Sequence, residues 1–369
     1  MTEPSADTYA LKSTALTEIV APDLPYQPPM PRAFRPSIGV IGAGGIAAAH
    51  LDAYRTAGWH VAAICNRSID KARAKAAAFA PHARLTDSYL DILSDPTITV
   101  VDITPHPADR LPMIEAALNA GKHVLSQKPF VLDLAHGQRL VDLARANGVK
   151  LAVNQNGRWA SHLSYMRHAV QAGLIGDVIS AHVAIHWNHG WIAGTPFDQI
   201  EDLIMYDFGI HWFDFLHSIT PGRARHVFAT ANHAPHQTAK APLLAQVLVQ
   251  LDHGQASLVF DGATPFGPRD TTTITGTNGS LHSEGPDLGQ QTVTLTTAAG
   301  VARPVLQGTW FNDGFRGAMG ALLVAIEDDT EPANGAAENL HSLALAFAAI
   351  HSRRTGRMVA VGKATRLTV

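Results

Sequence analysis

Apolar and polar positions follow two different patterns along this chain, and the change between them falls at about residue 159. Before that point, short apolar runs typical of buried strands alternate with segments that have a helical period. The strand-like runs lie at 38–41, 60–65, 98–104, 122–127 and 149–156, and the helical segments at 46–56, 68–80, 111–120 and 132–147. This alternation predicts a parallel sheet with helices on both of its faces.

Beyond residue 159, one helical segment at about 160–172 is followed by a series of strand-like runs. These runs lie at 178–187, 225–233, 243–252, 255–262 and 271–276, and turn signals such as "DHGQ" and "TNGS" separate several of them. Consecutive strands joined by tight turns predict a large, mostly antiparallel open sheet. With late helices at about 315–327 and 336–352, this second part is predicted to be an α+β domain.

The segment "IGVIGAGGIAAAH" (38–50) places three glycines between a strand and a helix. Gly42 permits a sharp turn, Gly44 lets a pyrophosphate approach the backbone, and Gly45 with Ile46 opens a helix whose N–H groups attract phosphates. Ala47 is small enough for close packing of helix and strand. A second strand follows within about 30 residues, which is the context of a dinucleotide-binding unit. We therefore interpret the loop as a dinucleotide site and not only as a tight turn.

Ligands of such sheets lie beyond the carboxyl ends of the parallel strands. The residues at these ends are expected to line one crevice for the cofactor: Gly42, Gly44, Gly45, Ile46, Asn66, Arg67, Thr104, Pro105, His106, Gln127, Lys128 and Asn154.

The whole-chain composition narrows the class of protein. With 369 residues, 46% of them hydrophobic and a net charge of −3, the chain suits two globular domains and has no basic field for nucleic acid. It has no apolar run of about 18 residues and no signal-peptide pattern, and its only cysteine is Cys65. We expect a cytoplasmic protein without membrane contact.

Three regions follow from these patterns. Residues 1–36 form a proline-rich N-terminal arm, which we expect to pack on the body or on a neighbouring subunit. We expect residues 37–158 to form an α/β Rossmann dinucleotide-binding domain, and residues 159–369 to form an α+β domain for substrate binding and oligomerisation. The final helix and strand of the chain can pack back on the first domain. The broad second sheet needs a cover, so we expect a homo-oligomer, a dimer or tetramer, through that sheet.

Four motifs in order resemble the Gfo/Idh/MocA oxidoreductases over about residues 37–361: "GAGGIAAAH", "AGKHVLSQKP", "VNQNGRW" and "DFGIHWFD". The resemblance implies NAD or NADP as cofactor and oxidation or reduction of a ring hydroxyl of a sugar, inositol or related polyol. Three positions depart from the family pattern. Gln127 replaces a glutamate, Asn66 stands where an acidic residue is expected, and Arg110 lies near where many members have a histidine.

The candidate catalytic residues are Lys128, Asp207 and His211. Asp207 and His211 are four residues apart, so a helix would place both on one face. A carboxylate beside an imidazole can orient a hydroxyl while the imidazole takes its proton. The resemblance implies that Lys128 binds the same hydroxyl and the nicotinamide ribose, where its charge would stabilise an alkoxide.

Further side chains are predicted to contact substrate. Asn156 and Arg158 follow the sixth strand, although Asn156 suits an inter-domain hinge equally well. Trp310 resembles part of a family loop that returns to the pocket, although simple packing explains it equally. The predicted substrate wall is completed by His186, Trp187 and His189. The histidines lack the compact spacing of a metal site, so no metal is expected.

The choice of cofactor and the reaction each leave alternatives. Asn66 can bind a ribose 2′-hydroxyl without repelling a 2′-phosphate, and Arg67 can clasp that phosphate or stack on adenine; NAD is favoured over NADP. The predicted function is an NAD(P)-dependent sugar or polyol dehydrogenase. The alternatives are a glycoside-cleaving enzyme that works by transient ring oxidation and elimination, and a non-catalytic dinucleotide sensor.

Overall fold

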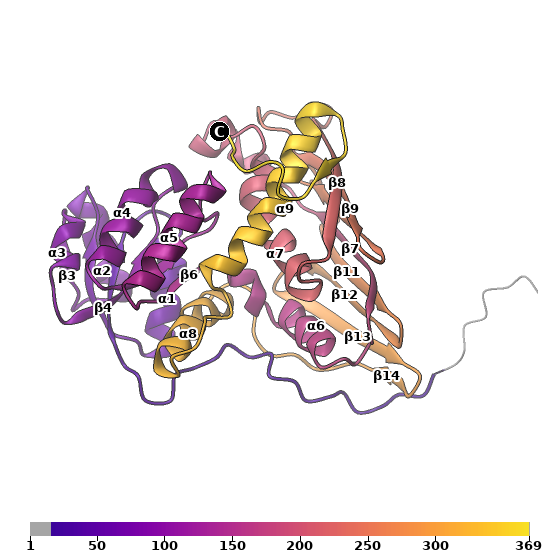
Figure 1. The fold of residues 1–369 in the computed structure, drawn as a ribbon, viewed down its shortest axis with the longest axis horizontal. Helices are drawn as coiled ribbons and strands as arrows, with labels where there is room; N and C mark the ends of the chain where they lie inside the picture. The colour runs from indigo at the N-terminus through magenta and orange to yellow at the C-terminus, as the bar shows by residue number, and fades with distance from the viewer. Residues whose placement is uncertain (1–15, 369) are drawn as a thin grey trace, which may run out of the picture.

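A computed structural model describes residues 16–368, and Figure 1 shows two sheets with helices between them. The first sheet is six-stranded within these residues and entirely parallel, in the order β3-β2-β1-β4-β5-β6. Its strands are β1 (Ser37–Ile41), β2 (Val61–Cys65), β3 (Arg84–Thr86), β4 (Ile98–Ile103), β5 (His123–Ser126) and β6 (Leu151–Val153). The predicted parallel sheet is confirmed. The short edge strand β3, which is too short and polar to give a strand pattern, adds to it.

Helices connect consecutive strands of this sheet. They are α1 (Ala47–Ala57), α2 (Ile69–Phe79), α3 (Tyr89–Leu93), α4 (Pro107–Asn119) and α5 (Leu134–Ala146). The chain moves outward from β1 to β3 and then returns to the other side of β1, so the strand order reverses between β1 and β4. The glycine loop follows β1 and therefore lies at this reversal, where open parallel sheets bind ligands.

The second sheet is nine-stranded in the described part of the chain, in the order β14-β13-β12-β11-β7-β10-β9-β8-β15. Its strands are β7 (Val178–His186), β8 (Ala224–Asn232), β9 (Leu244–Leu251), β10 (Gln255–Asp261), β11 (Arg269–Gly276), β12 (Gly279–Asp287), β13 (Gln290–Thr297), β14 (Gly300–Ala302) and β15 (Val359–Ala360). All neighbours are antiparallel except β7 and β10. The predicted mostly antiparallel sheet is confirmed, and β12 to β14 extend it.

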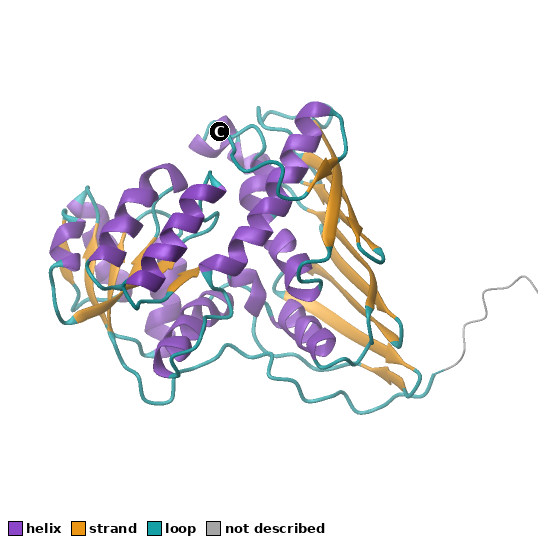
Figure 2. Cartoon of the chain, in the orientation of Figure 1, coloured by secondary structure: helices purple, strands orange, loops and turns teal. Residues whose placement is uncertain are grey.

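Helices cover one face of the second sheet, as Figure 2 shows. They include α6 (Ser161–Gln171), α7 (Ile210–Ile219) and α9 (Ala336–Thr355). Alternating burial along β7 records the two faces: Val183 and Ile185 are buried, whereas His182 is exposed and His186 half-exposed. The opposite face exposes Ile179 and Leu248.

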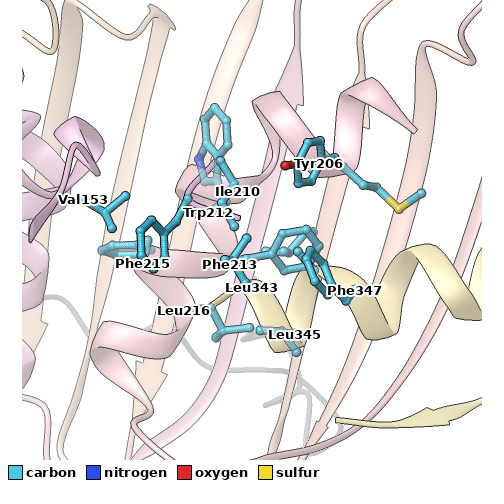
Figure 3. Packing of buried hydrophobic residues seen from close by; sticks show 14 of the residues in the cluster. Val153, Tyr206, Ile210, Trp212, Phe213, Phe215, Leu216, Leu343, Leu345 and Phe347 are labelled. Carbon is cyan, nitrogen blue, oxygen red and sulfur yellow. The ribbon is translucent and has the colours of Figure 1, made fainter. Parts of the chain in front are cut away.

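One hydrophobic core joins the two sheets. Helix α7 is largely buried and packs against α9, with Trp212, Phe213 and Phe347 almost fully buried (Figure 3). Helix α9 also contacts α5 of the first domain, and α8 (Asp313–Glu327) contacts α1. The late helices therefore fix the position of one sheet relative to the other.

The described part of the N-terminal arm, residues 16–36, extends along both domains of its own chain (Figure 1). Near its start, the backbone around Glu18 pairs with Val301 at the β14 edge of the large sheet. Tyr26 then packs edge-on against Tyr165 of α6. At its far end, the Glu327 carboxylate of α8 accepts three backbone N–H groups of the arm.

Of the helices within residues 16–368, none combines the length and hydropathy that a bilayer crossing requires.

The Glu327 cap predicts a pH-dependent contribution of the arm to stability. The N–H groups of Ala33, Arg32 and Phe34 hold the pKa of the Glu327 carboxyl below its ordinary value of 4.5. A lowered folded-state pKa stabilises the fold above the unfolded pKa, and the effect disappears as pH falls through the folded value. We expect Glu327→Gln to lower the thermal midpoint at pH 7, and the difference from wild type to shrink as the pH falls below 4.5 and through the folded-state pKa.

Glu331→Gln is the matched control for this measurement, because Glu331 is exposed just beyond the same helix. Equal midpoints of Glu327→Gln and wild type at pH 7, followed by differential scanning calorimetry, would contradict a stabilising cap.

Candidate active site

A cavity of about 250 Å³ lies where the two domains meet. The first domain contributes Ile46 from the glycine loop and Gln127 and Lys128 from the carboxyl end of β5. The second domain contributes most of the wall, which includes many aromatic side chains. The remaining lining residues are Asn156, Trp187, His189, Trp191, Phe197, Leu203, Ile204, Asp207, Phe208, His211, Leu288, Trp310, Phe311 and Phe315.

Lys128 and Asp207 join the two domains inside this cavity. The Lys128 Nζ atom donates to the Asp207 backbone carbonyl at 2.8 Å and lies 3.1 Å from its carboxylate oxygen Oδ2. Both side chains are partly buried, with 14% and 29% of their surface exposed. The ammonium group therefore has a fixed position and direction within the cavity.

Asp207 and His211 do not share one regular α-helix. Asp207 lies in a π-helical turn, Ile204–Phe208, and His211 lies in the first turn of α7. The π-turn adds a residue at the entry to the helix, and such turns are frequent at functional sites. Both side chains still line the cavity, so the structure brings them together with Lys128.

The His211 ring is held against aromatic side chains and has an altered basicity. It contacts Trp310 edge-on with ring centroids 5.0 Å apart. Burial lowers the pKa of His211 well below its ordinary value of 6.5, and the nearby Lys128 ammonium lowers it further. His211 is therefore a neutral imidazole at neutral pH, as a proton acceptor must be.

Gly157 permits this arrangement of rings. A Cβ atom at Gly157 would lie 2.8 Å from the Trp310 ring and 3.4 Å from the His211 Cβ. The Trp310 Nε1 atom donates to Asn156 Oδ1 at 3.2 Å. Asn156 and Trp310, both predicted as substrate residues, thus line the cavity while bonded to each other.

The three glycines of the loop differ in the space around their Cα atoms. Gly42 has a φ of 102°, and a Cβ atom there would lie 2.4 Å from Thr104 Oγ1. At Gly44 and Gly45 a Cβ atom would meet nothing within 4 Å. Of the three loop glycines, only Gly42 is required by packing within the described chain. The open surface at Gly44 and Gly45, beside the amino end of α1, fits a dinucleotide pyrophosphate.

Other predicted cofactor residues border this loop. The Asn66 Oδ1 atom accepts from the Ala43 backbone N–H at 3.0 Å, and Arg67 is exposed. Thr104 supports the loop by donating to the Ile41 carbonyl. The buried Arg110 side chain donates to the backbone carbonyls of Pro105 and Pro129. Arg110 therefore connects the loop after β4 to the loop after β5. His106 is exposed and its ring contacts Phe197.

A buried polar chain orients Gln127. The Asp102 carboxylate accepts from Tyr54 at 2.7 Å and contacts His50 Nδ1 at 2.8 Å. His50 Nε2 lies 3.1 Å from Asn154 Nδ2, which also donates to Gln127 Oε1 at 2.8 Å. Because a carboxylate only accepts, the proton of the His50 ring is assigned to Nδ1. His50 Nε2 then accepts from the Asn154 amide, whose nitrogen also donates to Gln127 Oε1. Asn154 thus acts behind the cavity wall, and sequence reasoning missed the role of His50.

Arg158 and His186 lie outside the cavity. Arg158 forms a bidentate pair with Asp214, at 2.6 and 2.9 Å, and is almost fully enclosed. His186 is paired with Asp261 at 2.9 Å on the sheet, and it is not among the lining residues. In contrast, His189, three residues further on, does line the cavity. Within residues 16–368, the carboxylate, cysteine and histidine side chains form no group of three or more suited to a metal ion.

The parallel sheet with its glycine loop, facing a second sheet across a Lys–Asp–His cavity, defines a two-domain, dinucleotide-binding oxidoreductase fold. Residues 37–155 match the family described as "Oxidoreductase family, NAD-binding Rossmann fold", and residues 163–282 match the "GFO/IDH/MocA C-terminal domain". The chain belongs to the Gfo/Idh/MocA family, and the resemblance seen in the four motifs is confirmed.

Similar proteins act on sugars and polyols. D-apiose dehydrogenase of Paraburkholderia graminis is 26% identical over 337 residues, which cover 87% of this chain and 88% of that protein. Inositol 2-dehydrogenase of Salmonella typhimurium is 28% identical over 182 residues, or 48% of this chain and 53% of that protein.

Solved structures share the fold. An oxidoreductase from Agrobacterium radiobacter in complex with NAD+, L-tartaric acid and magnesium has a TM-score of 0.79 at 22% identity, covering 89% of this chain and 99% of that chain. Levoglucosan dehydrogenase in complex with NADH and levoglucosan has a TM-score of 0.76 at 18% identity, covering 89% and 100%.

The open space at Gly44 predicts a selective loss of dinucleotide binding. A valine there has room in the free protein but would occupy the proposed pyrophosphate position. We expect Gly44→Val to raise the Kd for NAD by at least about 10-fold, measured by calorimetry, with an unchanged thermal midpoint of the free protein. Unchanged NAD binding would show that the loop is only a turn.

Proposed function

We propose that this chain is an NAD(P)-dependent dehydrogenase that oxidises a secondary ring hydroxyl of a sugar or polyol. The observation that carries the proposal is the meeting of Lys128, Asp207 and His211 in one cavity beside the glycine loop. The family assignment and the sugar and polyol dehydrogenases among its similar proteins support the substrate class.

Each of the three side chains has a distinct proposed role. His211, neutral because burial lowers its pKa, accepts the proton of the reacting hydroxyl at the ring nitrogen that faces the cavity. Lys128 donates to the same oxygen and stabilises the negative charge that develops on it. Asp207 holds the Lys128 ammonium in place and orients the hydroxyl. A bound nicotinamide dinucleotide supplies the hydride acceptor.

In this proposal, the first domain binds the cofactor and the second domain binds the sugar. Residues 37–158 hold the dinucleotide through the loop at Gly44 and Gly45, with Asn66 and Arg67 at its adenosine end. Residues 159–369 provide the aromatic wall for the sugar.

We also propose that the exposed face of the large sheet, which carries Ile179 and Leu248, forms the interface of a homo-oligomer. Sedimentation that shows only monomer at micromolar concentration would contradict this.

The role of His211 predicts a loss of turnover without a loss of cofactor. Removal of a positioned general base costs about 100- to 10,000-fold in rate. We expect His211→Ala to lower kcat by that order on the best sugar substrate, with the Kd for dinucleotide unchanged. In wild type, the acid-side fall of kcat/KM should lie well below pH 6.5, because the lowered pKa keeps the His211 ring neutral above that range.

The matched control is His217→Ala, because His217 lies on the same helix and contacts Glu338 outside the cavity. It should keep near wild-type turnover. A His211→Ala variant with wild-type turnover, when a deuterium isotope effect shows hydride transfer to be rate-limiting, would exclude His211 as the base. Aryl glycosides in the same assay address the cleavage alternative, whose signature is aglycone release without net dinucleotide reduction.

We propose NAD as the preferred cofactor. Solved structures of the same fold contain NAD+ or NADH, and Asn66 is placed at the end of β2 where a ribose 2′-hydroxyl would lie. We expect Asn66→Asp to strengthen the preference for NAD, because a carboxylate repels a 2′-phosphate. Arg67→Ala should weaken NADP binding more than NAD binding. Equal losses of both cofactors would indicate adenine stacking instead.

A further inference from the structure

The cavity wall is strongly aromatic and carries no unpaired charge among its described residues. Seven of its side chains are Trp or Phe: Trp187, Trp191, Phe197, Phe208, Trp310, Phe311 and Phe315. Its only ammonium, Lys128, is paired with its only carboxylate, Asp207. A carboxylate or phosphate on a ligand would therefore lose water without gaining a free cation, which is costly in an apolar site.

His189 supplies a second imidazole to this wall, separate from His211. Its ring contacts Phe208 edge-on with centroids 4.2 Å apart and is tilted against Trp187 at 6.0 Å. Its backbone N–H donates to the Gly262 carbonyl at 2.6 Å. Ring and backbone of His189 are thus both fixed within the cavity wall.

Trp191 determines which nitrogen of His189 carries the proton. The Trp191 Nε1–H donates to His189 Nδ1 at 3.1 Å, and an indole nitrogen can only donate. Nδ1 is therefore the acceptor of the neutral ring, and the proton lies on Nε2. Burial lowers the pKa of His189 to about 4, so the ring stays neutral at neutral pH. The Nε2 atom is buried and has no hydrogen-bond partner in the described chain.

A buried donor without a partner is rare in folded proteins, and here it belongs to a side chain that lines the cavity. We infer that His189 is a substrate-binding residue whose Nε2–H donates to a sugar oxygen, and that the cavity selects uncharged sugars over sugar acids and sugar phosphates. The inference rests on the proposed dehydrogenase function and specifies its substrate class. The aromatic rings provide the surface for the apolar face of such a sugar.

The first experiment measures kcat and KM with NAD and with NADP for neutral and charged sugars. The neutral probes are D-glucose, D-apiose, myo-inositol and levoglucosan, and the charged probes are D-gluconate, D-glucuronate and D-glucose 6-phosphate. We expect a neutral probe to have the highest kcat/KM. Preference for a charged probe would overturn the inference and leave the dehydrogenase function intact. If none of the probes supports reduction of NAD or NADP, the proposed dehydrogenase function is contradicted instead.

The second experiment tests the donor with the best probe. Loss of one neutral hydrogen bond predicts a rise in KM of about 3- to 10-fold for His189→Phe, with a smaller change in kcat and an unchanged Kd for dinucleotide. His189→Gln keeps an N–H donor and should restore KM to within about 3-fold of wild type. The control is His60→Phe, because His60 is exposed just before β2 in the first domain, away from the cavity lining.

The third measurement reads the tautomer directly. Nitrogen-15 NMR of histidine-labelled protein should show the Nε2-protonated form for His189 in wild type, and Trp191→Phe should shift the Nδ1 resonance because it removes the hydrogen bond to that atom. A wild-type KM in His189→Phe, or a wild-type His189 protonated on Nδ1, would overturn the donor role. If His189→Phe does not fold, His189→Gln and the wild-type spectrum still decide the question.

Discussion

The contact between Lys128 and Asp207 is the interaction on which the rest of the site depends. It joins the carboxyl end of β5 to the π-turn before α7, and these two elements belong to different sheets. Because the pair lies in a partly buried cavity, each charge needs the other, and loss of either partner would leave an unpaired charge there. Burial lowers the pKa of the neighbouring imidazoles of His211 and His189, and the same ammonium lowers the pKa of His211 further. A single ion pair therefore connects the two domains inside the cavity.

Polar side chains on the two sides of the cavity differ in how extensively they hydrogen-bond to one another. On the first-domain side, Asp102, His50, Asn154 and Gln127 form a continuous buried chain of hydrogen bonds. Such a chain rigidifies its members, because each amide or imidazole is oriented by the one behind it. On the second-domain side, His211 Nδ1 and His189 Nε2 are buried without hydrogen-bond partners in the described chain. Asp102 Oδ1 and Asn154 Oδ1 also lack a partner in the described chain, so unused hydrogen-bonding capacity is present on both sides of the cavity.

The late helices make this division possible. Helix α9 contacts strands of both sheets through one shared core, and α8 packs against α1 and β6 of the first domain, so the cavity lies between walls whose separation is fixed by packing. The arm adds a second connection, since it reaches from the β14 edge to the end of α8. Burial of aromatic side chains dominates such cores, and Trp212, which contacts Trp187 and Trp310, extends the core directly into the cavity wall.

The sequence by itself determined the features whose signals are local. Period, turn residues and the glycine loop lie within short windows, so the parallel sheet, the change of pattern near residue 159 and the family were predictable. Strands β12 to β14 are rich in Gly, Ser, Thr and Gln and lack a sustained apolar alternation, which explains their omission. Only the tertiary structure decided which polar side chains face the cavity. Arg158 is paired with Asp214, 56 residues away, and His186 with Asp261, whereas His189, beyond the end of β7, lines the cavity. Those outcomes depend on partners distant in sequence and on strand register, which no local pattern encodes.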